Sequence, residues 1–166
     1  LILASSNGDE AACQSLLSKG ADINFKDNDG WTALMKASWN GHEAVCSLLI
    51  SSSADINVTD NVGWTALMKA SRMGHEAVCK LLISSAANIN AKNNDGYTAL
   101  IKASRNGHEA VCKLLISSSA DINAENNDGW TALSLAKTER IKTLLTVGLS
   151  LIVASGNGVE AACQSL

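Results

Sequence analysis

The sequence predicts an all-α fold, a solenoid of stacked helix pairs, and two observations support that prediction. The first is a period of 33 residues, which spaces both a set of glycines and a set of cysteines. Three segments align without a gap, each identical to the next at 25 of 33 positions: 27–59, 60–92 and 93–125. The second is that each unit contains two short apolar segments with helical spacing. Such a pair buries its apolar face only when neighbouring units stack, which gives a one-dimensional array.

The unit over 27–59 shows the expected elements in order. Its first four residues, Asp-Asn-Asp-Gly, favour a tight turn. Thr32 precedes the apolar run that follows and is predicted to cap the first helix, which Gly41 ends. A second helix is predicted to begin at His42, to carry apolar residues over 44–50 and to end in three serines. An extended loop then leads to the next turn.

Four stretches of this unit carry a family resemblance: G-W-T-A-L-M-K-A at 30–37, N-G-H at 40–42, L-L-I at 48–50 and A-D-I-N at 54–57. They resemble the ankyrin repeat. The resemblance implies L-shaped units, with helices stacked into a curved wall and β-hairpin or loop fingers projecting to one side. The unit departs from the family where alanine replaces the usual proline and where Met35 replaces the first-helix histidine.

A further departure concerns the glycine that usually caps the second helix. It survives as Gly20 but is replaced by Ser53, Ala86 and Ser119 in the later units. If these residues adopt the left-handed conformation, each costs about 1 kcal/mol.

The predicted organisation is one array over 1–166. In its fifth unit, 141–145 is predicted to form an abbreviated second helix with Gly148 as the C-cap. Residues 151–166 then match 1–16 at 13 of 16 positions. The predicted units are 1–26 (partial), 27–59, 60–92, 93–125, 126–148 (shortened) and 149–166 (partial).

Composition argues against several classes of function. The net charge of −3 and the pI near 5.5 argue against a nucleic-acid-binding surface. The longest apolar stretch is too short for membrane insertion, which needs about 20 residues. The five cysteines are widely spaced and form no CxxC pair, so they are interpreted as core thiols of an intracellular, cytoplasmic protein.

The sequence also contains no arrangement typical of catalysis. The histidines His42, His75 and His108 lie one repeat apart, too far for a single zinc ion, and each is interpreted as stabilising its own Gly-His turn. Neither a G-x-S-x-G elbow nor a Gly-rich phosphate loop occurs. We therefore expect no enzyme, no cofactor and no metal site.

The leading functional hypothesis is a non-catalytic scaffold that binds a partner protein on its finger-facing, concave surface. Aromatic and basic residues gather there, and an acidic segment is the expected ligand. Two other readings remain open at this stage: the aromatic residues pack against the next finger, and the basic stripe is a solvated face. The candidate partner-binding residues are Trp31, Lys36, Trp39, Trp64, Lys69, Arg72, Met73, Tyr97, Lys102, Arg105 and Trp130.

Two alternative functions are compatible with the sequence. One is head-to-tail self-assembly into a filament through uncapped solenoid ends, because apolar residues lie at both ends of the array. The other is a targeting module within a larger multidomain protein. The candidate self-association residues are Leu1, Ile2, Leu3, Leu151, Ile152 and Val153.

Overall fold

The computed structural model describes residues 1–148, and within that range every regular element is a helix. This confirms the predicted all-α class. The labelled helices are α1 (Ile2–Asn7), α2 (Glu10–Ser18), α3 (Ala33–Asn40), α4 (Glu43–Ser51), α5 (Ala66–Met73), α6 (Glu76–Ser84), α7 (Ala99–Asn106) and α8 (Glu109–Ser117). Within the described residues a further helix spans 139–148.

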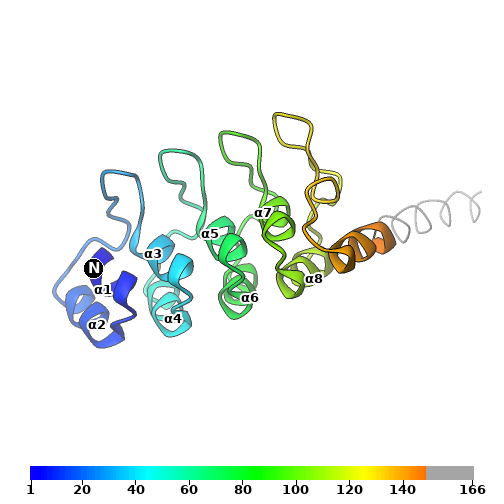
Figure 1. The fold of residues 1–166 in the computed structure, drawn as a ribbon. Coiled ribbons are helices and arrows are strands. Elements are labelled where there is room, and N and C mark those ends of the chain that lie inside the picture. Colours follow the sequence, from blue (N-terminus) through cyan, green and yellow to red (C-terminus); the bar gives the residue numbers. More distant parts are fainter. Residues whose placement is uncertain (149–166) are drawn as a thin grey trace, which may run out of the picture.

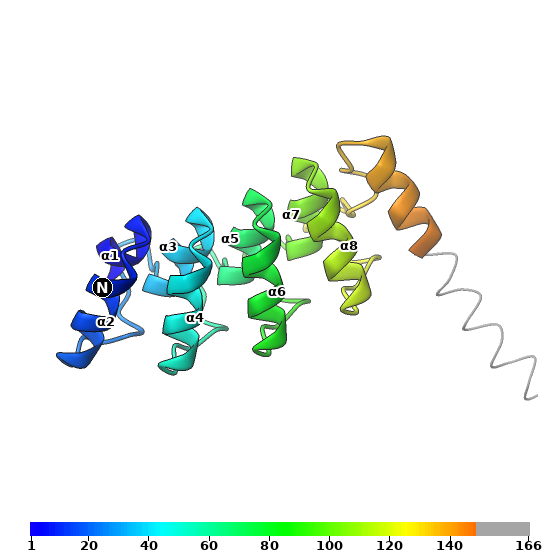
Figure 2. The same cartoon turned by 90° about the horizontal axis from the view of Figure 1, so that it is seen from below.

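The helices stack in two parallel rows (Figures 1 and 2). The first helices pack in the order α1, α3, α5, α7, and the second helices in the order α2, α4, α6, α8. A long loop precedes each of α3, α5 and α7 and projects to the same side of the array (Figure 1). The architecture is therefore a solenoid in which each pair contacts its neighbours.

The first helices begin and end as the sequence predicts. Thr32 has extended backbone, and its Oγ1 accepts a hydrogen bond from the Met35 N–H at 3.3 Å. Thr65 and Thr98 cap α5 and α7 in the same way. Gly41 adopts the left-handed conformation at φ 78° and ends α3. A threonine N-cap of this kind contributes about 1 kcal/mol to helix stability.

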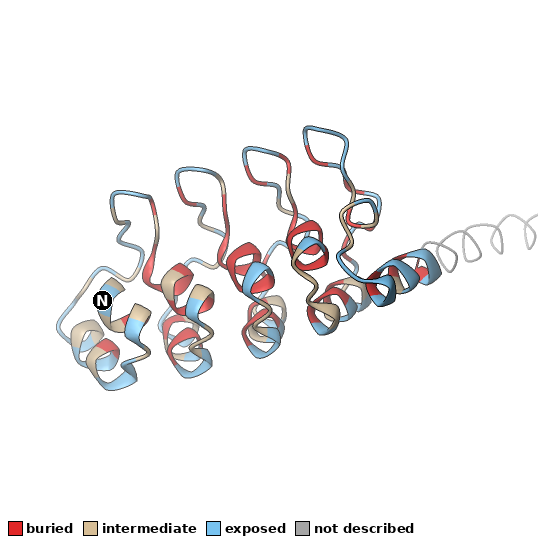
Figure 3. Cartoon of the chain, viewed as in Figure 1, coloured by how far each residue is buried: buried red, intermediate tan, exposed pale blue. Residues whose placement is uncertain are grey.

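The core lies between the two rows of helices (Figure 3). In the second unit Leu34, Met35 and Leu49 are at most 1% exposed. The equivalent positions of the next two units are buried to the same degree. Each buried Leu or Met side chain contributes about 1.5–3 kcal/mol by leaving water.

The cysteines of the described part pack in this core, as predicted. Cys13, Cys46, Cys79 and Cys112 are all fully buried and free. Burial raises the pKa of Cys46 and Cys79 to about 11 and that of Cys112 to about 12. The thiols of Cys46, Cys79 and Cys112 are therefore uncharged at neutral pH and behave as small hydrophobes. Cys163 lies outside the described residues.

Positive φ values occur at the three residues that replace the capping glycine. Ser53, Ala86 and Ser119 have φ of 70°, 67° and 69°, while Gly20 has 83°. The non-glycine residues therefore adopt the left-handed backbone that the family resemblance implied.

The fingers are loops, one of the two forms that the family resemblance implied, and each is closed by turn bonds such as Gly30 N–H to Asp27 O at 2.9 Å. Residues 131–135 form a turn where the earlier units have a first helix, because Ser134 Oγ hydrogen-bonds the Thr131 backbone and competes with helical bonding. One prediction needs correction: Gly148, the last residue that the structure describes, has helical backbone with no left-handed φ, and so lacks the conformation expected of a glycine C-cap.

The histidines join neighbouring units, so the reading that each stabilises only its own turn was incomplete. His75 Nε2 lies 2.9 Å from the Trp39 carbonyl oxygen of the preceding unit. Its ring packs so closely on Gly41 that a Cβ there would lie 2.6 Å from Nδ1. His42 and His108 repeat the carbonyl contact at 3.0 and 2.9 Å.

Candidate functional site

Aromatic rings and lysines alternate along the base of the fingers. The Lys69 ammonium lies 3.3 Å from the centre of the Trp31 ring and 5.4 Å from that of Trp64. The Lys102 ammonium lies 4.6 Å from Trp64 and 3.4 Å from Tyr97. Each of these lysines thus contacts the ring of its own unit and that of the preceding unit. Cation–π contacts contribute about 0.5–2 kcal/mol and fix the positions of the cations.

Two arginines continue this pattern at the ends of α5 and α7. The Arg72 guanidinium lies 5.3 Å from the Trp39 ring and 5.4 Å from Trp64. Arg105 Nη1 donates a hydrogen bond to Tyr97 Oη at 3.4 Å. Both side chains remain exposed to solvent. We call the surface formed by these rings and cations the aromatic–cation face.

Two of the lysines are paired with a carboxylate from the turn of their own finger. Lys36 lies 3.1 Å from Asp27, and both side chains are about a quarter exposed. Lys69 lies 2.7 Å from Asp60, and both side chains are almost completely buried. Burial lowers the pKa of Lys69, and the Asp60 carboxylate opposes that effect.

The third lysine has no such partner. Asn93 stands where the earlier units have Asp27 and Asp60. Lys102 makes no ion pair within the described residues and is only 8% exposed. Burial, together with the nearby Arg105 and Arg72, lowers the pKa of Lys102 to about 8.

Two adjoining pockets open on the aromatic–cation face. The first, of about 240 Å³, contains three tryptophans and is lined by Trp31, Trp39, Asp60, Val62, Trp64, Lys69 and Arg72. The second, of about 190 Å³, is polar and is lined by Arg72, Lys102, Arg105 and Asn106. Arg72 lines both, so the two pockets adjoin one another at this side chain.

The candidate partner-binding residues fall into different environments. Lys69, Lys102 and Trp64 are largely buried, at 2%, 8% and 9% exposed. Met73 and Trp130 are 40% and 49% exposed but line neither of these two pockets. The two pockets therefore bring together a subset of the candidates: Trp31, Trp39, Trp64, Lys69, Arg72, Lys102 and Arg105.

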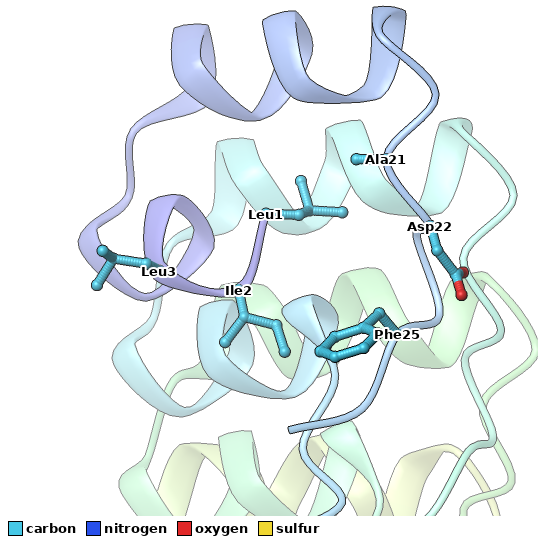
Figure 4. Close-up of a pocket in the computed structure, with 6 residues that line it drawn as sticks. All are labelled: Leu1, Ile2, Leu3, Ala21, Asp22 and Phe25. Atoms are coloured by element: carbon cyan, nitrogen blue, oxygen red, sulfur yellow. The ribbon is translucent and has the colours of Figure 1, made fainter. Parts of the chain in front are cut away.

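A separate apolar surface lies at the outer side of α1. Leu1, Ile2, Leu3, Ala21, Asp22 and Phe25 line a pocket of about 300 Å³. Ile2 and Phe25 face one another across it, while Leu3 points outward (Figure 4). Leu3 and Phe25 are 74% and 60% exposed. The other half of the self-association prediction, Leu151 to Val153, lies outside the described residues.

Comparison with known families agrees with this geometry. A family model described as ankyrin repeats (3 copies) matches residues 1–93 and 79–152. The chain belongs to the ankyrin-repeat family. No curated protein matches the chain. Ankyrin repeats are in general protein–protein interaction modules and typically non-enzymatic.

The sequence analysis did not predict the hydrogen bonds between successive fingers, and it left Asn106 out of the candidate site. The Asn61 and Asn127 side chains donate to the Asn28 and Asn94 carbonyls at 2.9 and 3.0 Å and so link successive fingers. The 33-residue spacing of these asparagines was the available signal. Asn106 lines the basic pocket, and its amide donates to the Lys102 carbonyl at 2.8 Å.

Within residues 1–148 there is no cluster of His, Cys, Asp and Glu side chains suited to a metal ion. Over the same range no helix has the length and apolar character needed to cross a membrane.

Proposed function

We propose that the chain is a non-catalytic scaffold that binds an acidic segment of a partner protein on the aromatic–cation face. The observation that carries the proposal is the pair of adjoining pockets, one aromatic and one basic, that share Arg72. Aromatic and arginine side chains are the usual anchors of protein interfaces. The expected ligand is an extended segment with an apolar residue for the first pocket and acidic residues for the second.

The chemistry of the face supports an acidic ligand although the whole chain is acidic. The net charge of the chain is −3, yet Arg72, Lys102 and Arg105 gather around one pocket. Opposite charge on a partner accelerates association and excludes wrong partners. We also infer an intracellular location, which the buried, reduced cysteines support.

Peptide display on the purified chain tests this proposal. Selected peptides are expected to carry net negative charge together with an apolar residue. Arg72→Glu/Arg105→Glu should slow their association, weaken its salt dependence and reduce affinity about tenfold or more. The control Lys80→Glu/Lys113→Glu makes the same change of charge at exposed positions on α6 and α8 and should bind normally. Equal binding by wild type and the arginine double variant contradicts the proposal.

The apolar surface outside α1 favours a second candidate function, head-to-tail self-association of this chain. One side of α1 packs on α3, whereas Leu3 of α1 and Phe25 of the loop after α2 are exposed. In a solenoid an exposed apolar end can receive another helix pair, and a second copy supplies one. Contacts between unlike faces form open filaments or rings.

Sedimentation from micromolar to near-millimolar concentration tests self-association. We expect the wild type to form larger species as concentration rises, and Leu3→Glu to prevent it without loss of helicity. Val62→Glu, at a finger residue that is 54% exposed, is the matched control. A monomer at all concentrations refutes the second candidate function.

A further inference from the structure

The basic pocket arises from one change of residue in the repeat. In the second and third units one oxygen of Asp27 or Asp60 accepts the N–H of Trp31 or Trp64 at 2.8 Å. The other oxygen binds the lysine of the same unit. These two carboxylates therefore serve both the turn and the lysine.

Asn93 keeps the first of these contacts and loses the second. Its Oδ1 accepts the Tyr97 N–H at 2.7 Å, so the turn is preserved. Its Nδ2 is a donor and lies 3.5 Å from Asp95 Oδ2, directed to a carboxylate instead of to the lysine. Lys102 consequently keeps its place between the Trp64 and Tyr97 rings without a carboxylate partner.

Two rings hold three cations around this pocket. Trp64 contacts both Arg72 and Lys102, and Tyr97 contacts both Lys102 and Arg105. None of the three cations makes an ion pair within residues 1–148. The electrostatic repulsion between them is not offset by an acidic side chain that lines the pocket. Cations fixed near one another in this way are preorganised for an anion.

The donor set fits a phosphoryl group better than a single carboxylate. A phosphate monoester carries a charge of about −1.5 to −2 near pH 7 and presents three acceptor oxygens. A carboxylate carries one charge and two oxygens. Two guanidinium groups and an ammonium provide the donors, and Asn106 has a second amide N–H beyond the one given to Lys102.

We propose that the pocket lined by Arg72, Lys102, Arg105 and Asn106 binds the phosphoryl group of a phosphorylated residue in the partner segment. This inference rests on the proposed function, because it names the group by which the acidic segment is anchored. It predicts that phosphorylation of that segment increases its affinity. Free phosphate has the same chemistry and serves as the minimal probe.

Calorimetric titration of the purified chain with inorganic phosphate is the first test, with acetate for comparison. We expect phosphate to bind and acetate to bind at least about tenfold more weakly. Arg72→Gln/Arg105→Gln should abolish phosphate binding, whereas Lys80→Gln/Lys113→Gln should leave it unchanged. Phosphate binding that is equal in all these proteins, or absent from the wild type, overturns the proposal.

Asn93→Asp is the sharper variant because it restores the residue of the preceding units and preserves the turn. The new carboxylate should pair with Lys102 as Asp60 pairs with Lys69. We expect phosphate affinity to fall about tenfold. Unchanged affinity in this variant shows that Lys102 takes no part and contradicts the proposed site.

Proton uptake gives an independent signature. The pKa of Lys102 is about 8, lowered by burial and by Arg105 and Arg72, while Asp95 opposes the shift. A bound dianion stabilises the ammonium, so phosphate binding at pH 8 should take up a fraction of a proton. Calorimetry in buffers of different ionisation enthalpy measures this fraction. Uptake should disappear in Lys102→Met, and uptake that persists there overturns the assignment to Lys102.

A phosphoserine peptide separates the two sources of phosphate. It should be derived from an acidic peptide that binds the aromatic–cation face, and compared with its unphosphorylated form. Stronger binding of the phosphorylated form supports the proposal, whereas stronger binding of inorganic phosphate than of that peptide indicates a free-anion site and overturns it. If acidic peptides fail to bind but phosphate does, the proposed function fails and the pocket stands as an anion site.

Discussion

At the scale of single residues, three positions retain a strained backbone that glycine would relieve. Ser53 and Ser119 have φ near 70°, and Ala86 has 67°. We predict that Ser53→Gly, Ala86→Gly and Ser119→Gly each increase the free energy of unfolding, by up to about 1 kcal/mol. Urea denaturation measures the change. Ser52→Gly is the control, because Ser52 has φ −88° and glycine there only adds freedom to the unfolded chain. Equal effects at Ser52 and Ser53 contradict the explanation.

Lys102 makes stability depend on pH in a defined direction. Its pKa is about 8 in the folded protein, against an ordinary value of 10.5. Between these values the unfolded chain binds more protons than the folded chain, so stability rises with pH. The buried Lys102 ammonium destabilises the folded protein fully below pH 8, and this destabilisation is lost as the pH rises to 10.5. We predict that the free energy of unfolding of the wild type, measured relative to that of Lys102→Met, increases between pH 8 and pH 10.5. A difference between the two proteins that does not change with pH contradicts this prediction.

At the scale of the element, the contact between units depends on glycine at the end of each first helix. Gly41 has φ 78°, and a Cβ there would lie 2.6 Å from the His75 ring. Gly20 has φ 83° but nothing within 4 Å. We predict that Gly41→Ala lowers the free energy of unfolding more than Gly20→Ala, by about 1 kcal/mol or more, because the ring must move and its bond to the Trp39 carbonyl weakens. Equal losses would show that backbone strain alone matters.

Local signals explain why the helices were predictable and the histidine contacts between units were not. Thr32 and Gly41 act on their own helix, so the bounds of α3 follow from neighbouring residues. The His75 contact joins residues 36 apart in the sequence, and it exists only once two units have stacked. Residues 131–135 matched the repeat at their start, but Ser134 provided a local alternative to the helix.

The same distinction applies to the candidate site. The repeat grouped aromatic and basic residues on one face, and the structure brings most of them to two pockets. It also buries Lys69, because the Trp31 ring of the preceding unit covers its ammonium. The lack of an ion-pair partner at Lys102 could have been predicted from Asn93. That prediction requires knowing that Asp27 and Asp60 bind the equivalent lysines.

At the scale of the whole molecule, stability in a solenoid is the sum of its units and of the contacts between neighbours. The shortened unit contributes less to the free energy of unfolding, because residues 131–135 form one turn in place of an eight-residue helix such as α7. Its last helix is held mainly by Ile141 and Leu145, which are fully buried. Local opening in such an array has a lower free energy where fewer contacts must break.

We therefore predict that amide hydrogens over 131–148 exchange faster than those of α5 to α8, with mass spectrometry of peptic fragments as the measurement. Leu145→Ala removes a buried side chain and costs about 2–5 kcal/mol locally. It should accelerate exchange over 139–148 and leave α3 and α4 protected, because the main contacts between helices join neighbouring units. Equal protection of 131–148 and α7, or loss of protection along the entire array in Leu145→Ala, would mean that the chain unfolds as one cooperative unit despite its repeating construction.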